Sequence, residues 1–267
     1  MVSADEGAAG AEHLPVISWR DRVNILRQNI KFKWVPFRAY YRYRSYKYMR
    51  NIDPEMGLLR FLMNREKISL DIGANLGLFT HLLARYSKHV HAFEPNPLAF
   101  GILSSAKDTN VTLYRQALTD RTEQVNLVVP RSRKGWSSNG ASLRPMNVDN
   151  FRLVPTPGRR LDDLSLPPIG FVKIDVEGHE LSVLKGALET LRRDRPALFI
   201  ENEQLYTGDD VGEVFRILGG LDYDGFFLDE GVLTNISQFS VAEHQTSRRG
   251  AGASGKRYVK NFVFIPR

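Results

Sequence analysis

The sequence predicts an α/β fold of the Rossmann type, with a mostly parallel, doubly wound sheet and an antiparallel strand near the C-terminus. Short apolar runs alternate with helix-length segments from residue 56 onward, as expected for parallel strands joined by crossover helices. A glycine-rich turn joins the first of these strands to the helix after it. Two late strands flank a basic, glycine-rich loop, and we expect this final pair to include the antiparallel strand.

The individual elements follow from apolar periodicity and from turn residues between the periodic segments. We expect helices at residues 56–64, 76–86, 98–106, 180–191 and 212–218. We expect strands at residues 67–72, 89–93, 111–114, 125–129, 171–174, 197–201, 224–228 and 262–265. The stretch at 130–158 is rich in Ser, Gly, Arg and Pro and therefore predicts a long loop.

Composition divides the chain into three parts. Residues 1–17 are rich in Ala, Gly and acidic side chains, which predicts a disordered or loosely attached tail. Residues 18–54 alternate cationic and aromatic side chains and predict one or two helices, with a break at Pro36. Between Arg20 and Arg50 this part holds ten basic residues and one acid, which accounts for more than the net charge of +7. Residues 55–267 form the α/β domain.

Composition also excludes several classes of protein. The chain has no cysteine, so it has no disulfide and no thiolate metal site. No apolar run approaches the roughly 20 residues that span a bilayer. The first residues have neither the basic start nor the apolar run of a secretory signal. We therefore expect a cytoplasmic protein, with a peripheral contact to the inner face of the membrane as one role for the basic segment.

The strongest motif is LDIGANLG at residues 70–77, which directly follows an apolar strand and directly precedes a helix. Gly73 and Gly77 allow a sharp turn and a close backbone approach to a ligand. Asp71 stands at the carboxyl end of its strand, where open α/β sheets bind ligands. The next strand ends in Glu94, twenty-three residues after Asp71, where a carboxylate can accept hydrogen bonds from both ribose hydroxyls. The residues predicted to bind this cofactor are Asp71, Gly73, Ala74, Asn75, Gly77, Glu94 and Pro95.

Charge and spacing indicate which cofactor this is. The two glycines are spaced G-x-x-x-G, without the close G-x-G that cradles a pyrophosphate in dinucleotide sites. Asp71 would sit poorly beside a phosphate, but it can pair with an ammonium group. S-adenosyl-L-methionine has an α-amino group and no phosphate, so we expect it in preference to NAD.

The segments DIGANLGLFT, FEPNP, KIDVEGHE and NFVFIP, in this order and spacing, resemble the FkbM-type methyltransferases. The resemblance runs from about Glu55 to the C-terminus. It implies a class I methyltransferase fold, S-adenosyl-L-methionine as the methyl donor, and methylation of a hydroxyl on a sugar or another secondary metabolite. The basic aromatic segment lies outside the family pattern.

Further polar residues are expected at the same edge of the sheet. The strand at 171–174 leads into DVEGHE, and the strand at 197–201 ends in Glu201. Methyl transfer to an alcohol needs a proton acceptor, and His179 titrates near neutrality. We therefore expect His179, Asp175 and Glu177 to be catalytic. Alternatively, Asp175 and Glu201 hold a divalent cation such as Mg²⁺, which lowers the pKa of the acceptor hydroxyl.

The predicted function is O-methylation of a hydroxyl-bearing small molecule, sugar, glycan or glycolipid. A nucleic-acid methyltransferase and a non-catalytic S-adenosylmethionine-binding adaptor stay open as alternatives. The sequence DVEG stands where base-amine methyltransferases are expected to have Asn/Asp-Pro-Pro-aromatic, so nucleic acid is not the expected partner.

The basic segment at 18–50 has three interpretations. Its aromatic side chains cover the flank of the sheet while its cations reach water, or it contacts an anionic membrane or glycan, or it binds nucleic acid.

Overall fold

A computed structural model describes residues 19, 23, 26, 36–51, 54–105, 107–132, 135–136, 140–144, 150–207, 211–245 and 258–267. The predicted tail at 1–17 and most of 18–35 lie outside these residues. Among those described, no helix is both long and apolar enough to cross a membrane.

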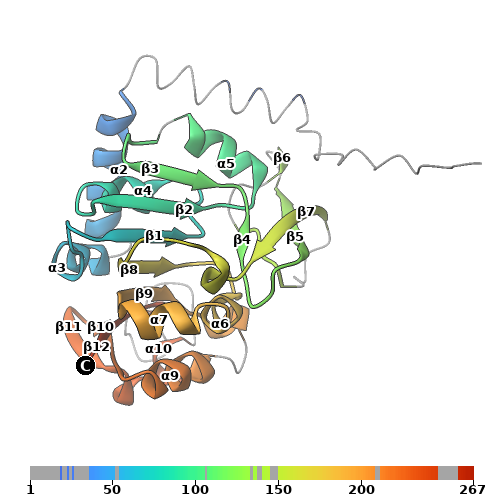
Figure 1. Cartoon of the computed structure of the whole chain (residues 1–267). Helices are drawn as coiled ribbons and strands as arrows, with labels where there is room; N and C mark the ends of the chain where they lie inside the picture. Colours follow the sequence, from blue (N-terminus) through green and yellow to red (C-terminus); the bar gives the residue numbers. More distant parts are fainter. Residues whose placement is uncertain are drawn as a thin grey trace, which may run out of the picture.

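The main sheet of the described chain has eight strands in the order β11-β10-β12-β9-β8-β1-β2-β3 (Figure 1). These strands are β1 (Ile68–Ile72), β2 (His89–Phe93), β3 (Val111–Tyr114), β8 (Ile169–Ile174), β9 (Ala197–Glu201), β10 (Tyr223–Asp229), β11 (Val232–Asn235) and β12 (Asn261–Pro266). Strands β3, β2, β1, β8 and β9 run parallel, and β12 inserts antiparallel between β9 and β10. The predicted fold class is confirmed, including the antiparallel C-terminal strand.

Helices cover both faces of this sheet. They are α2 (Phe37–Asn51), η1 (Pro54–Leu58), α3 (Leu59–Leu62), α4 (Leu78–Ala84), α5 (Pro97–Ser104), η2 (Leu161–Asp163), α6 (Glu180–Lys185), α7 (Leu188–Asp194), α8 (Gln204–Thr207), α9 (Val211–Gly220), η4 (Ile236–Gln238) and α10 (Val241–His244). Helix α2 begins directly after Pro36, and the residues just before that proline lie outside the described part of the chain. The single helix expected at 180–191 is instead two, α6 and α7, separated at Gly186 and Ala187.

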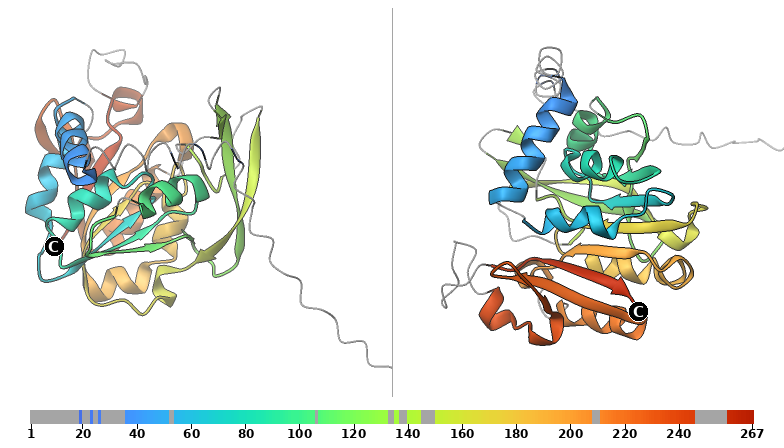
Figure 2. Two further views of the ribbon diagram at one scale, coloured as in Figure 1. Left: turned by 90° about the horizontal axis from the view of Figure 1, so that it is seen from above. Right: turned by 90° about the vertical axis from the view of Figure 1, so that its left-hand side faces the viewer.

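A second sheet stands beyond the carboxyl ends of the parallel strands, in the order β4-β7-β5-β6. Its strands are β4 (Ala117–Leu118), β5 (Gln124–Ser132), β6 (Gly135–Trp136) and β7 (Phe151–Arg159). The prediction of a loop over 130–158 is wrong where it covers the end of β5, β6 and β7. In the left-hand view of Figure 2, β5 and β7 lie at one end of the molecule and α2 at the other.

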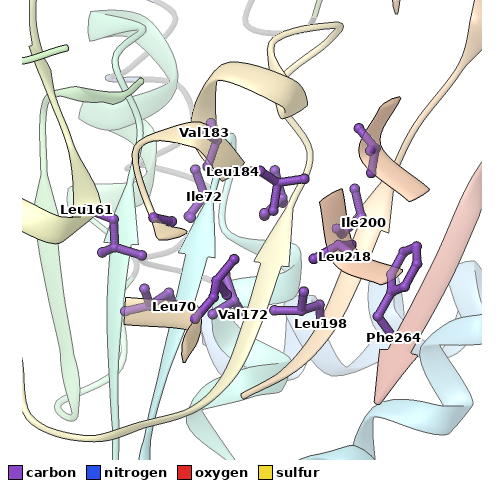
Figure 3. Close-up of a cluster of buried hydrophobic side chains, with 14 of the residues drawn as sticks. Leu70, Ile72, Leu161, Val172, Val183, Leu184, Leu198, Ile200, Leu218 and Phe264 are labelled. Atoms are coloured by element: carbon purple, nitrogen blue, oxygen red, sulfur yellow. The ribbon is translucent and has the colours of Figure 1, made fainter. Parts of the chain in front are cut away.

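The core lies on the two faces of the main sheet. On one face, side chains of β1, β8 and β9 pack against α6 and α9. Figure 3 shows Leu70, Ile72, Val172, Leu198 and Ile200 from these strands beside Val183, Leu184 and Leu218 from the two helices. On the other face, residues such as Ala92 and Phe171 pack with Leu83 of α4. All five side chains of β1 are buried, as expected for a central parallel strand.

Candidate active site

A pocket opens at the carboxyl ends of β1, β2 and β8, where ligands bind in open α/β sheets. Residues 116–118, Leu127 of β5 and residues 140–143 form its other wall. The second sheet, which the sequence did not reveal, therefore contributes to the pocket. The space between the two walls, counted together with the solvent at its open mouth, is about 650 Å³.

The glycine-rich turn forms the floor of this pocket. Gly73 and Ala74 both donate their backbone N–H to the carbonyl of Phe93, at 3.0 Å each, which fixes the turn against β2. Gly73 has φ +80°, and a Cβ on it would lie 1.8 Å from the Asp175 carbonyl oxygen. A side chain at this position would therefore push β1 away from β8.

The predicted turn residues have different surroundings. Gly73 and Asn75 line the pocket. Ala74 is buried among the core residues on the α4 side of the sheet. Gly77 is the N-cap of α4 with φ +89°, and a Cβ on it would meet the Leu103 side chain at 2.3 Å. Ala74 and Gly77 therefore shape the turn from behind, whereas Gly73 and Asn75 face the pocket.

Glu94 is a buried carboxylate at the end of β2 that also lines the pocket. Its Oε2 accepts the backbone N–H of Asn75 at 2.6 Å, and its Oε1 accepts that of Asn96 at 2.8 Å. Burial raises the pKa of Glu94 to about 7, against the opposing effect of the two N–H donors. Pro95, the next residue, lines the same pocket.

Asp71 lies behind the pocket and is fully buried. Its Oδ2 accepts a hydrogen bond from the Thr80 hydroxyl at 2.6 Å, and its Oδ1 lies 3.2 Å from Nζ of Lys173. The same ammonium group lies 3.3 Å from Oδ2 of Asp175 and donates to the Gly73 carbonyl at 2.8 Å. Burial lowers the pKa of Lys173, but Asp175 and Asp71 outweigh this effect and raise it above its usual value.

Lys173 therefore joins the ends of β1 and β8. The register of the two parallel strands places Asp71 directly beside Lys173. Removing one partner of a buried ion pair is strongly destabilising, because the other charge is then left buried without compensation. In this structure Asp71 and Lys173 fix the turn and orient Asp175.

The three predicted catalytic residues all line the pocket. His179 shares a hydrogen bond of 2.9 Å between its Nε2 and the Thr119 hydroxyl, and burial lowers its pKa to about 4. The carbonyl of Glu177 accepts a hydrogen bond from the Ser142 hydroxyl at 2.7 Å. Glu177 has φ 53°, a left-handed conformation that is rare for this residue type and that the surrounding loop imposes.

Glu201 forms an ion pair with Lys260. Its Oε2 lies 2.8 Å from Nζ of Lys260, and it is not among the described residues that line the pocket. Burial and then the charge of Asp175 raise its pKa well above the usual value. Across the described part of the chain, no group of three or more His, Asp or Glu side chains is arranged to hold a metal ion. Asp175 and Glu201 each have an ammonium partner instead.

The charge of the pocket follows from its lining. Glu94, Asp175 and Glu177 contribute three carboxylates, and the described lining residues include no Lys or Arg. Lys173 offsets the charge of Asp175 from behind the lining, and Glu94, with a pKa of about 7, is only partly ionised at neutral pH. The charge that Glu177 and Glu94 retain still favours a cationic group and hydroxyl donors over a phosphate.

Sequence reasoning missed several residues that shape this site. Ser142 and Thr119 come from the second wall of the pocket, and nothing in their sequence context indicates that they meet DVEGHE. Lys173 did carry a signal, a cation within the apolar run FVKI, but its two partners depend on a strand register that the sequence does not contain.

Two curated proteins resemble the chain over much of its length. One is the hexuronic acid methyltransferase AglP of Haloferax volcanii, 27% identical over 188 residues, which cover 64% of this chain and 70% of the relative. Another is the 2-O-methyltransferase NoeI of Sinorhizobium fredii, 27% identical over 171 residues, which cover 57% of this chain and 70% of the relative.

Among solved structures, the chain is similar to the methyltransferase FkbM of Methylobacillus flagellatus, with 16% sequence identity and a TM-score of 0.47. The match covers 93% of this chain and 62% of that one, so the chain spans less than two thirds of the solved protein. The sequence profile described as the methyltransferase FkbM domain matches residues 71–225, more than half of the chain. The protein therefore belongs to the FkbM methyltransferase family.

Proposed function

We propose that this methyltransferase takes its methyl group from S-adenosyl-L-methionine and transfers it to a hydroxyl of a sugar. The observation that carries the proposal is the lining of the pocket, which has three carboxylates and no described Lys or Arg at the carboxyl ends of β1 and β2. The names of the two relatives, a hexuronic acid methyltransferase and a 2-O-methyltransferase, support a sugar oxygen as the acceptor.

The residues around the turn fit this cofactor. Each carboxyl oxygen of Glu94 accepts one backbone N–H. Each oxygen also has a further lone pair, which could accept a hydrogen bond from a ribose hydroxyl. Gly73, Asn75 and Pro95 would line the nucleoside. When bound, S-adenosyl-L-methionine supplies a methyl group on a positively charged sulfur, which suits the carboxylates of this pocket.

His179 is the residue we assign to the acceptor hydroxyl. Burial lowers its pKa to about 4, so the imidazole is neutral at physiological pH and has a lone pair for the hydroxyl proton, although it is a weak base in the protein without ligands. Nε2 of His179 shares its hydrogen bond with the Thr119 hydroxyl. When Nε2 carries the proton and donates it in this bond, Nδ1 has the lone pair and acts as the base. The charge of Asp120, which raises the pKa of His179 against the effect of burial, would stabilise the imidazolium that forms.

Calorimetry with purified protein tests the cofactor assignment. We expect S-adenosyl-L-methionine to bind, NAD not to compete, and Glu94→Ala to weaken binding by about 1.5–3 kcal/mol, the scale of a lost charged hydrogen bond. Glu66→Ala is the matched control, because Glu66 is an exposed carboxylate away from the pocket. Tighter binding of NAD, or equal affinities of wild type and Glu94→Ala, would overturn the proposal.

A further inference from the structure

Helix α2 is attached to the domain through one face. Tyr41 is only 3% exposed, and its hydroxyl donates a hydrogen bond to the carbonyl of Leu76 in the glycine-rich turn. Its ring stacks on that of His81 in α4, with 5.5 Å between the ring centres. His81 in turn bonds Asp108 through Nδ1 at 2.7 Å. The helix therefore has a fixed position on the domain.

The opposite face of α2 points to solvent. Arg42, Tyr43, Tyr46 and Lys47 are all exposed, and the two tyrosines are 64% and 58% exposed. At 3.6 residues per turn these four positions share one side of the helix, and Tyr41 lies on the other. No acidic residue occurs in the sequence of α2. This outer face of α2 is thus cationic, aromatic and exposed.

The shape and surroundings of the outer face narrow the choice of partner. A helix is convex, and the right-hand view of Figure 2 shows α2 on the outside of the molecule. On α3, which follows η1 along the chain, Phe61 is 72% exposed and has the Arg60 guanidinium 4.4 Å from its ring centre. Rings beside cations on a convex element suit a broad, flat, anionic surface.

We propose that the outer face of α2 docks on a bilayer that contains anionic phospholipids. Tyr side chains settle at the level of the headgroups, where one end of the ring is apolar and the phenol is wet. Arg42 lies one turn from Tyr46, and Lys47 lies one turn from Tyr43. Both cations attract the anionic headgroups. The residues that line the candidate active site include none from α2, so the pocket stays open when this face is covered. The proposal does not depend on the identity of the methyl acceptor.

Co-sedimentation of the full chain with vesicles tests this surface. We expect binding to vesicles of phosphatidylcholine mixed with phosphatidylglycerol, and little binding to phosphatidylcholine alone. The double variant R42Q/K47Q should bind the anionic vesicles about 30-fold more weakly, since each cation near such a surface contributes a factor of about five. Y43S/Y46S should also bind more weakly, with the same dependence on salt as wild type. Raising the ionic strength from about 0.1 M to about 1 M shortens the screening length from about 10 Å to about 3 Å and should release the wild type.

K185Q/R192Q is the matched control, because it removes the same charge from two exposed positions on α6 and α7. It should bind as wild type does. Equal binding of R42Q/K47Q and K185Q/R192Q would contradict the proposal, because net charge alone would then explain the attraction. Failure of the wild type to bind anionic vesicles, or binding to RNA or a soluble acidic polysaccharide without binding to vesicles, would also overturn it. The melting temperature of each variant checks that the fold is intact.

Discussion

Glu94 accepts two backbone N–H groups, yet burial raises its pKa to about 7. Ligand hydroxyls that donate to this side chain favour its charged form. Folding without a ligand favours the protonated form, because the folded pKa lies above the ordinary value of 4.5. The contribution of Glu94 to stability is therefore present below about pH 4.5 and is lost as the pH rises through about 7.

Cofactor affinity should consequently rise with pH. If the ribose hydroxyls donate to Glu94, S-adenosyl-L-methionine should bind about tenfold more tightly at pH 8 than at pH 6, with release of a proton on the acidic side. Calorimetry in buffers of different ionisation enthalpy measures both quantities. Glu94→Gln should bind weakly and without this pH dependence. The same slope in Glu94→Gln would assign the titration to another group.

His179 should affect turnover and leave cofactor binding unchanged. Loss of a general base lowers kcat by about 10²–10⁴, so His179→Ala should fall in this range and keep its affinity for S-adenosyl-L-methionine. Because the pKa of His179 is lowered to about 4, kcat/KM for the acceptor at saturating cofactor should not decline between pH 7.5 and 5.5 through protonation of this residue. A decline with a midpoint near 6.5 that disappears in the variant would contradict this assignment.

Chelation with EDTA distinguishes catalysis by His179 as the general base from catalysis by a divalent cation. The ammonium groups of Lys173 and Lys260 beside Asp175 and Glu201 oppose a divalent cation at the same oxygens. Wild type is therefore expected to retain its turnover in EDTA. Loss of activity that Mg²⁺ restores would instead support a cation shared by Asp175 and Glu201.

The strands of the main sheet other than the edge strand β11 could be predicted because they are short apolar runs ending at charged or turn residues. The ranges 89–93, 111–114 and 197–201 agree with the observed β2, β3 and β9. Strand β7 was missed because Pro155 and Pro157 argue against a strand. Both prolines lie at exposed positions, and β4 pairs with β7 only at Gly158 and Arg159, beyond the prolines.

The basic segment shows what patterning cannot resolve. Cations and aromatic residues alternate so closely along it that the sequence does not tell which ring is buried. In the structure Tyr41 is buried and Tyr43 is exposed. The two interpretations, packing against the domain and contact with a partner, therefore apply to opposite faces of the same helix, the second as a proposal.

Tyr41 should accordingly be important for stability and for the glycine-rich turn. Tyr41→Phe removes the hydrogen bond to the Leu76 carbonyl and should lower the free energy of unfolding by about 1 kcal/mol. Tyr41→Ala also leaves a cavity beside His81 and should cost about 3 kcal/mol or more. Denaturant unfolding measures both, with Tyr43→Ala as the control on the exposed face. Equal stabilities of Tyr41→Ala and Tyr43→Ala would show that α2 is not anchored through Tyr41.

At the scale of the whole molecule, two sheets meet at one pocket. The parallel sheet places Glu94 and Asp175 at its carboxyl edge, and the second sheet closes the opposite wall. The sequence could predict the first half because each of its motifs is local, a strand followed by its own turn. The second half depends on contacts such as that of Ser142 with Glu177, which join segments far apart in the chain.

Transfer of an isotopically labelled methyl group from S-adenosyl-L-methionine to a cell extract tests the central claim most directly. Purified protein would be incubated with glycans, glycolipids and nucleic acids from cells that lack it, and the products identified by mass spectrometry. We predict a methyl ether on a sugar oxygen, one S-adenosylhomocysteine per methyl transferred, and loss of both products in Glu94→Ala and His179→Ala. Label on nucleic acid, or binding of the donor without transfer to any fraction of the extract, would contradict the account.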